Sequence, residues 1–153
     1  NVSLSQYSLK NNDLESAKLM LNQIGDPEMH RKTEGEIWSA ERDALKKDVS
    51  SNAAGTVQGI ISGQSKYADY WLEEAMGTWV AKDFDRAQEW YQQNWKSLPS
   101  NKSQYVAAAF ANQALKQGDA ATANQWAALI QDPKTKQRIQ DGINKAAVKN
   151  QNQ

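Results

Sequence analysis

The chain has 153 residues, 18 acidic and 18 basic side chains, and no cysteine. A formal net charge of zero argues against a nucleic-acid module, whose affinity depends on neutralising phosphates, and the lack of cysteine excludes disulfides and thiolate metal sites. No apolar run approaches the roughly 20 residues that span a bilayer, and the length suffices to bury the core of one domain.

The composition favours helices, because Ala, Gln, Lys, Glu and Leu are abundant and β-branched runs are absent. A short helix is expected within residues 1–12, and Asp13 is a suitable N-cap for a second helix. The third helix begins at Asp26 and Pro27, a carboxylate cap followed by proline at the first helical position. It is expected to run to residue 47.

The next segment, residues 48–65, allows two interpretations. Val57 and Ile60 belong to an apolar stripe at helical spacing, whereas Gly55, Gly59 and Gly63 lower helix stability by about 1 kcal/mol each relative to alanine. If the segment is a helix, the three glycines share one face, which could allow a neighbouring backbone to approach closely. The alternative is a frayed helix or a loop.

The stretch of residues 68–99 organises the chain and is predicted to form two amphipathic helices that turn at Asp83. A second pair follows over residues 104–130, with its turn at Gly118 and Asp119. Tryptophan and tyrosine are concentrated in the first pair. We expect most of these rings to fill the core between helices.

The last helix is predicted to begin at Asp132 and Pro133. Its single apolar stripe, flanked by polar residues, is typical of a capping helix with a neighbour on one side only. It is basic, whereas residues 69–89 contain six acidic and two basic side chains. A frayed tail is expected over residues 150–153.

Short acidic turns recur along the sequence. Asp13, Asp48, Asp83 and Asp119 are spaced by 35, 35 and 36 residues. In three of these turns an alanine follows four residues after the aspartate, namely Ala17, Ala87 and Ala123. A period of this length, with one helix-turn-helix per unit, indicates an α-solenoid.

Within that class, the central unit resembles a tetratricopeptide repeat. The residues that follow the spacing of this family are Trp71, Ala75, Trp79, Lys82-Asp83-Phe84, Ala87, Tyr91 and Pro99. The resemblance extends over residues 68–133 and includes little before them. It implies an all-α, right-handed superhelix of about four helical hairpins with a C-terminal capping helix, forming one domain over residues 1–149.

In this family the first helix of each hairpin lines a concave groove. The resemblance therefore implies a partner-binding groove lined by Asp69, Leu72, Met76, Trp79, Tyr105, Asn112 and Lys116. Aromatic, methionine and amide groups of this kind suit a protein or peptide ligand.

Catalytic and metal-binding patterns are weak. His30 is the only histidine, and with Asp26 and Glu28 it would form a metal site only if side chains from one helical turn converged. Several carboxylate pairs occur on charged helix faces, where solvation is the expected state, and these pairs are Glu34/Glu36, Glu41/Asp43, Glu73/Glu74 and Asp83/Asp85. No phosphate-binding glycine loop is present. We predict no catalytic residue, metal or cofactor.

The sequence thus predicts a non-catalytic module that binds a protein or peptide, with no nucleic acid and no membrane span. The alternative is a helical spacer within a larger enzyme or a secretion-type assembly. The chain begins with Asn1 and shows no signal peptide, which fits a removed leader or a fragment of a longer protein. We expect an exported or periplasmic location to be favoured over a cytoplasmic one.

Overall fold

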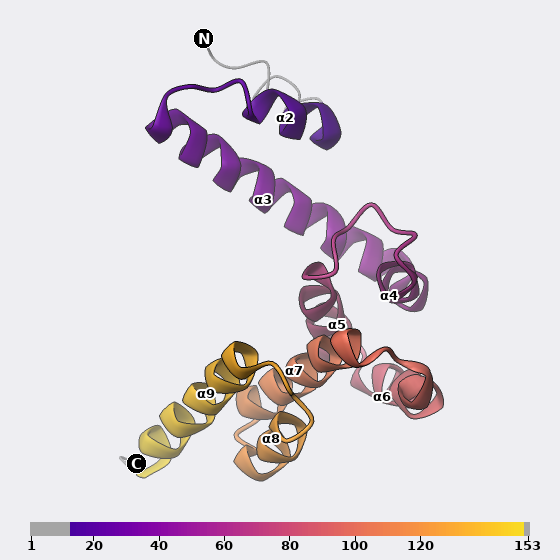
Figure 1. Cartoon of the computed structure of the whole chain (residues 1–153). Coiled ribbons are helices and arrows are strands. Elements are labelled where there is room, and N and C mark those ends of the chain that lie inside the picture. Colours follow the sequence, from indigo (N-terminus) through magenta and orange to yellow (C-terminus); the bar gives the residue numbers. More distant parts are fainter. Residues whose placement is uncertain (1–12, 152–153) are drawn as a thin grey trace. The chain divides into compact units, whose positions relative to one another are not determined.

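The computed structural model describes the backbone of residues 13–151 and the side chains of residues 13–149. Over this range the chain forms eight α-helices and one short 3-10 helix, with no strand (Figure 1). The prediction of an all-α protein is confirmed. The helix expected within residues 1–12 lies outside the described residues, and the expected tail lies partly outside them because α9 continues to Gln151.

The chain divides into two compact units, Asn1–Lys47 and Asp48–Gln153. In the first unit, α2 (Leu14–Leu21) packs beside the N-terminal part of α3 (Pro27–Ser51) (Figure 1). Ala17 on α2 and Ile37 and Leu45 on α3 are buried. Lys18 Nζ lies 2.9 Å from Oε1 of the buried Glu41, so an ion pair also joins these two helices.

Helix α3 does not end where the sequence predicted. It continues through Asp48 to Ser51, and Asn52 is the N-cap of the next helix, α4 (Ala53–Ser62). The expected turn at Asp48 is therefore wrong. Its carboxylate instead accepts a hydrogen bond of 2.6 Å from the hydroxyl of Tyr67, which fixes the loop after α4.

Gly55 lies in the first turn of α4, Gly59 lies within the helix and Gly63 lies at its C-terminal end. Gly63 is the C-cap with a φ of 76°, a left-handed conformation that glycine adopts without steric cost. A Cβ atom on Gly55 would meet the Asn52 side chain of the helix's own cap, and one on Gly59 would lie 3.5 Å from Ser65 Cβ. The segment is thus a helix, but the atoms nearest these glycines belong to its own cap and loop rather than to a neighbouring helix.

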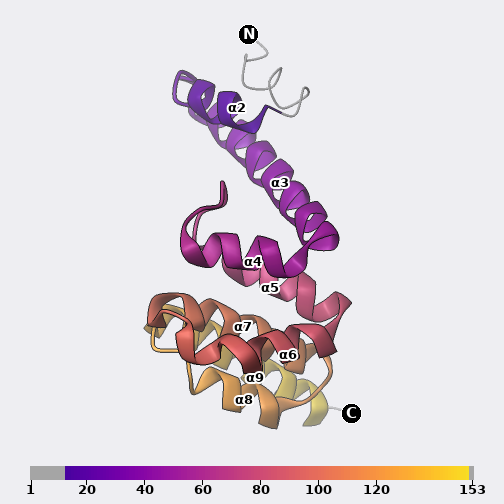
Figure 2. The same cartoon turned by 90° about the vertical axis from the view of Figure 1, so that its right-hand side faces the viewer.

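In the second unit, α5 and α7 form the most extensive helix pair. Helix α4 packs on α5, and α9 packs on α7 and α8 (Figure 2). Helix α7 buries side chains on several faces and α5 buries one wide face, so they form the centre of this unit. The remaining elements are α5 (Trp71–Lys82), α6 (Phe84–Asn94), η1 (Trp95–Ser97), α7 (Ser100–Lys116), α8 (Ala120–Ala127) and α9 (Pro133–Gln151).

Three of the four periodic aspartates have the same local structure. Asp13, Asp83 and Asp119 are N-caps, and each carboxylate accepts a hydrogen bond from the backbone N–H three residues later, at 3.1, 3.4 and 3.0 Å. Four residues after each aspartate lies a fully buried alanine: Ala17, Ala87 and Ala123. Small side chains at these positions allow the helix axes to approach closely.

Aromatic rings fill the spaces between α5, α6, α7 and α8. The rings of Phe110 and Trp126 are stacked with centroids 4.6 Å apart, and Tyr91 contacts both. On the other side of α6, the rings of Trp79 and Trp90 lie 5.7 Å apart, and both side chains are buried. The expected core-filling role is confirmed for these rings.

Candidate interaction site

The predicted groove residues separate into buried and accessible groups. Leu72 and Met76 are 0% exposed and Trp79 is 7% exposed, because α4, α6 and α7 all pack against α5. Tyr105 and Asn112 are half-buried and Lys116 is exposed. These last three residues are spaced by seven and four positions on α7, so they share one face of that helix. The binding groove itself stays a prediction.

Asp69, also a predicted groove residue, takes part in a structural contact. Its Oδ1 lies 3.1 Å from Nζ of Lys102, which is buried. The same ammonium group donates hydrogen bonds to the carbonyl oxygens of Ile60 at 3.3 Å and Ile61 at 3.0 Å. A cation at these carbonyls is favourable, because they lie at the negative end of the α4 dipole.

Lys102 was not singled out from the sequence, although a signal existed. It lies in the first turn of α7, where a cation opposes the dipole of its own helix. A lysine at such a position is better stabilised by acceptor groups outside its own helix. Its partners are distant in sequence, so they could not be identified from the local pattern.

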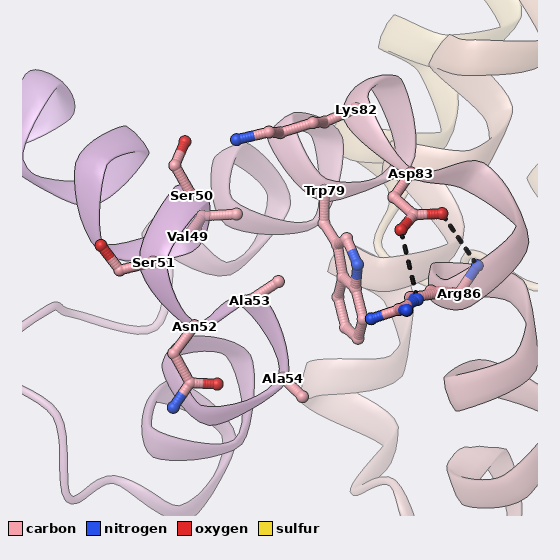
Figure 3. A pocket seen from close by; sticks show the side chains of 10 residues that line it. All are labelled: Val49, Ser50, Ser51, Asn52, Ala53, Ala54, Trp79, Lys82, Asp83 and Arg86. Atoms are coloured by element: carbon pink, nitrogen blue, oxygen red, sulfur yellow. Dashed lines mark hydrogen bonds and ion pairs between the residues drawn. The ribbon is translucent and has the colours of Figure 1, made fainter.

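A shallow pocket of about 490 Å³ adjoins Trp79 (Figure 3). We call it the Trp79 pocket. Figure 3 shows the indole of Trp79 at its centre, with the Arg86 side chain reaching toward the ring and Lys82 extending toward the end of α3. All of its lining residues belong to the second unit: Val49, Ser50, Ser51, Asn52, Ala53, Ala54, Trp79, Lys82, Asp83 and Arg86.

The segment of residues 69–89 is acidic, but its basic side chains are both located at this pocket. Lys82 and Arg86 are the two basic side chains between residues 69 and 89, and both line it. Arg86 is 81% exposed, and its Nε lies 3.5 Å from Oδ2 of Asp83, the N-cap of α6. The lining therefore carries two positive charges and one negative charge.

The acidic central segment and the basic last helix are joined by an ion pair within the second unit. Arg138 on α9 donates a hydrogen bond of 2.6 Å from Nη2 to Oε1 of Glu73 on α5. This ion pair is half-exposed, so it contributes modestly to stability. It nevertheless joins α9 to α5, in addition to the apolar contacts of the neighbouring Ile139 and of Ile143.

Several of the carboxylates considered for chemistry have structural partners. Asp26 Oδ1 accepts a hydrogen bond of 3.1 Å from the N–H of Glu28, and His30 Nδ1 lies 3.7 Å from Oε2 of Glu34 on the same helix face. Asp83 caps α6, while Glu41 and Glu73 are in the ion pairs described above. Among the residues that the structure describes, no group of three or more histidine, aspartate or glutamate side chains is placed to hold a metal ion.

Hydrogen bonding lowers the pKa of three capping aspartates. In Asp13, Asp119 and Asp132 the largest cause is the hydroxyl of the residue three positions later, followed by the backbone N–H of that residue. The hydroxyls of Ser16 and Thr122 donate at 2.6 Å and that of Thr135 at 2.7 Å. These carboxylates are therefore held ionised for helix capping.

No described helix combines the length and the apolar character that crossing a membrane requires. Comparisons of the chain with protein-family models, with curated proteins and with solved structures found no match.

Proposed function

We propose that this protein is a non-catalytic interaction module that binds a protein or peptide on the surface of a tetratricopeptide-like helical stack. The observation that carries this proposal is the face of α7 that presents Tyr105, Asn112 and Lys116. An aromatic ring, an amide and a flexible cation on one rigid helix provide both apolar contact and hydrogen bonds to a ligand.

The repeat arrangement is supported by local structure. Asp83 ends α5 and caps α6, and Asp119 caps α8 just after α7 ends. Gly118, which precedes Asp119, has a φ of 75° and permits this sharp turn. Two consecutive helix pairs thus have an aspartate N-cap before the second helix and a buried alanine four residues later, as repeated hairpins of one family would.

Affinity capture with the whole chain tests the proposed surface. The binding variants are Tyr105→Ala and Lys116→Glu, and the matched control is Lys149→Glu, which makes the same charge change on α9. We expect captured partners to be lost with the two α7 variants and retained with the control. Since these side chains are half-buried or exposed, circular dichroism should show an unchanged fold.

If capture is unaffected by the α7 variants, the proposed surface is wrong. If the chain captures no partner at all, the spacer alternative is favoured.

A further inference from the structure

We infer that the Trp79 pocket binds an acidic segment of a partner protein, with carboxylates of that segment paired to Lys82 and Arg86. This inference rests on the proposed function and names the chemistry of the partner. The pocket is separate from the α7 face, since none of Tyr105, Asn112 and Lys116 lines it.

Charge complementarity selects the occupant. The segment around the pocket is acidic, with six carboxylates between residues 69 and 89, yet its two cations both line this hollow. An acidic ligand would be repelled elsewhere on this segment and attracted here. Such an arrangement favours one docking position over its surroundings.

The start of α4 adds to the positive potential. Asn52, Ala53 and Ala54 line the pocket, and they are the cap and first two residues of that helix. The Asn52 side chain accepts a hydrogen bond from Gly55 N. The N–H groups of Ala53 and Ala54 belong to the first turn of α4, so no carbonyl within that helix can accept from them. Together with the helix dipole, they favour a carboxylate over a neutral group.

Trp79 gives the pocket a rigid wall. Trp79 is 7% exposed and its ring packs on that of Trp90, so packing restricts the rotation of the ring. Figure 3 shows the Arg86 side chain reaching toward this ring, and the Asp83 carboxylate holds the guanidinium through the contact of 3.5 Å. The guanidinium is thus partly pre-ordered, which reduces the entropy lost on binding.

The test uses the full chain with ¹⁵N-labelled tryptophan, whose six indole N–H signals can be followed separately. The probe is acetyl-Glu-Glu-Leu-Glu-Glu-amide, and the control peptide has glutamine in place of each glutamate. The Trp79 signal is assigned with Trp79→Phe. We expect the acidic probe to shift the Trp79 signal, with an affinity that falls as salt is raised, and the glutamine peptide to cause no shift.

Matched variants localise the binding. The double variant Lys82→Gln/Arg86→Gln should weaken binding of the acidic probe by about tenfold or more. The control double variant Lys136→Gln/Lys145→Gln removes the same charge from α9 and should bind as the parent chain does. Lys82→Arg, which keeps the charge, should also bind.

Three outcomes would overturn the inference: equal binding of the glutamine peptide, equal weakening in both double variants, or displacement of the probe by inorganic phosphate at matched ionic strength. The last would indicate a general anion site. Failure here is distinguishable from failure of the proposed function, because capture that still depends on Tyr105 and Lys116 would leave the α7 surface standing.

Discussion

The ammonium group of Lys102 lies 3.1 Å from Oδ1 of Asp69, and it is also within hydrogen-bonding distance of two carbonyls at the end of α4. The two partners differ in environment. Asp69 has a side chain that is 55% exposed, whereas the Lys102 side chain is 11% exposed. This difference indicates that Lys102 stabilises the fold mainly through the α4 carbonyls and less through the ion pair.

Lys102→Met keeps the aliphatic stem and removes the three donors. We expect the free energy of unfolding to fall by about 1–3 kcal/mol, since buried carbonyls lose their partner. Asp69→Asn should cost less than about 1 kcal/mol, as is usual for an exposed ion pair. Urea unfolding of both variants measures the difference. A larger loss for Asp69→Asn would mean that the ion pair is the main contribution.

Tyr67→Phe removes the hydroxyl that donates to Asp48 and leaves the buried ring. We expect a loss of about 0.5–1.5 kcal/mol in the free energy of unfolding, typical of one partly buried hydrogen bond. Tyr70→Phe is the matched control, because Tyr70 is exposed. Equal stability of the two variants in urea unfolding would show that the Asp48 contact contributes nothing.

Trp90→Ala removes a ring that is 8% exposed and packs on Trp79. The cavity and the lost apolar burial should lower the free energy of unfolding by about 3–5 kcal/mol. Trp95→Ala, at a side chain that is 49% exposed, should cost far less. Thermal or urea unfolding compares the two, and similar losses would contradict the assignment of Trp90 to the core.

The cap at Asp119 predicts that the stability of the fold depends on pH in the acidic range. Because hydrogen bonds from Thr122 hold the pKa of Asp119 below its ordinary value of 3.8, the folded state binds this proton less readily than the unfolded state. The contribution to stability is complete above about pH 4 and is lost as the pH falls through the lowered pKa.

Thr122→Val removes the hydroxyl donor and should move the pKa of Asp119 upward toward 3.8, as measured by carbon NMR of the carboxylate. Asp13 is an internal control, since its cap keeps Ser16 and its pKa should stay lowered in the same titration. An unchanged pKa at Asp119 would assign the lowering to the backbone N–H alone.

The sequence predicted the features that depend on neighbouring residues. The caps at Asp13, Asp83 and Asp119 follow local rules that hold in any fold, because the carboxylate and the backbone N–H that donates to it are three residues apart. The buried alanines follow from the same turns. Asp48 shares the period, but α3 continues through it to Ser51, and Asn52 is the cap of the next helix.

Features that depend on several neighbours were not predictable. Leu72 and Met76 were expected to line a groove, but a face that is open in one hairpin is covered when a third helix packs on it. The contact of Lys102 with α4 spans more than forty residues. A pattern read within one helix cannot show either arrangement.

The buried contacts of helix α9 lie between residues 138 and 143. Its buried side chains, among those described, are Ile139 and Ile143, and Arg138 pairs with Glu73 nearby. Gly142 lies where a Cβ would come within 3.1 Å of Leu115 Cδ1, so α9 lies close to α7 at this residue as well. Amide hydrogens beyond Ile143 should therefore exchange with solvent deuterium first, and a protease could shorten the helix from that end while the α5–α7 pair stays protected.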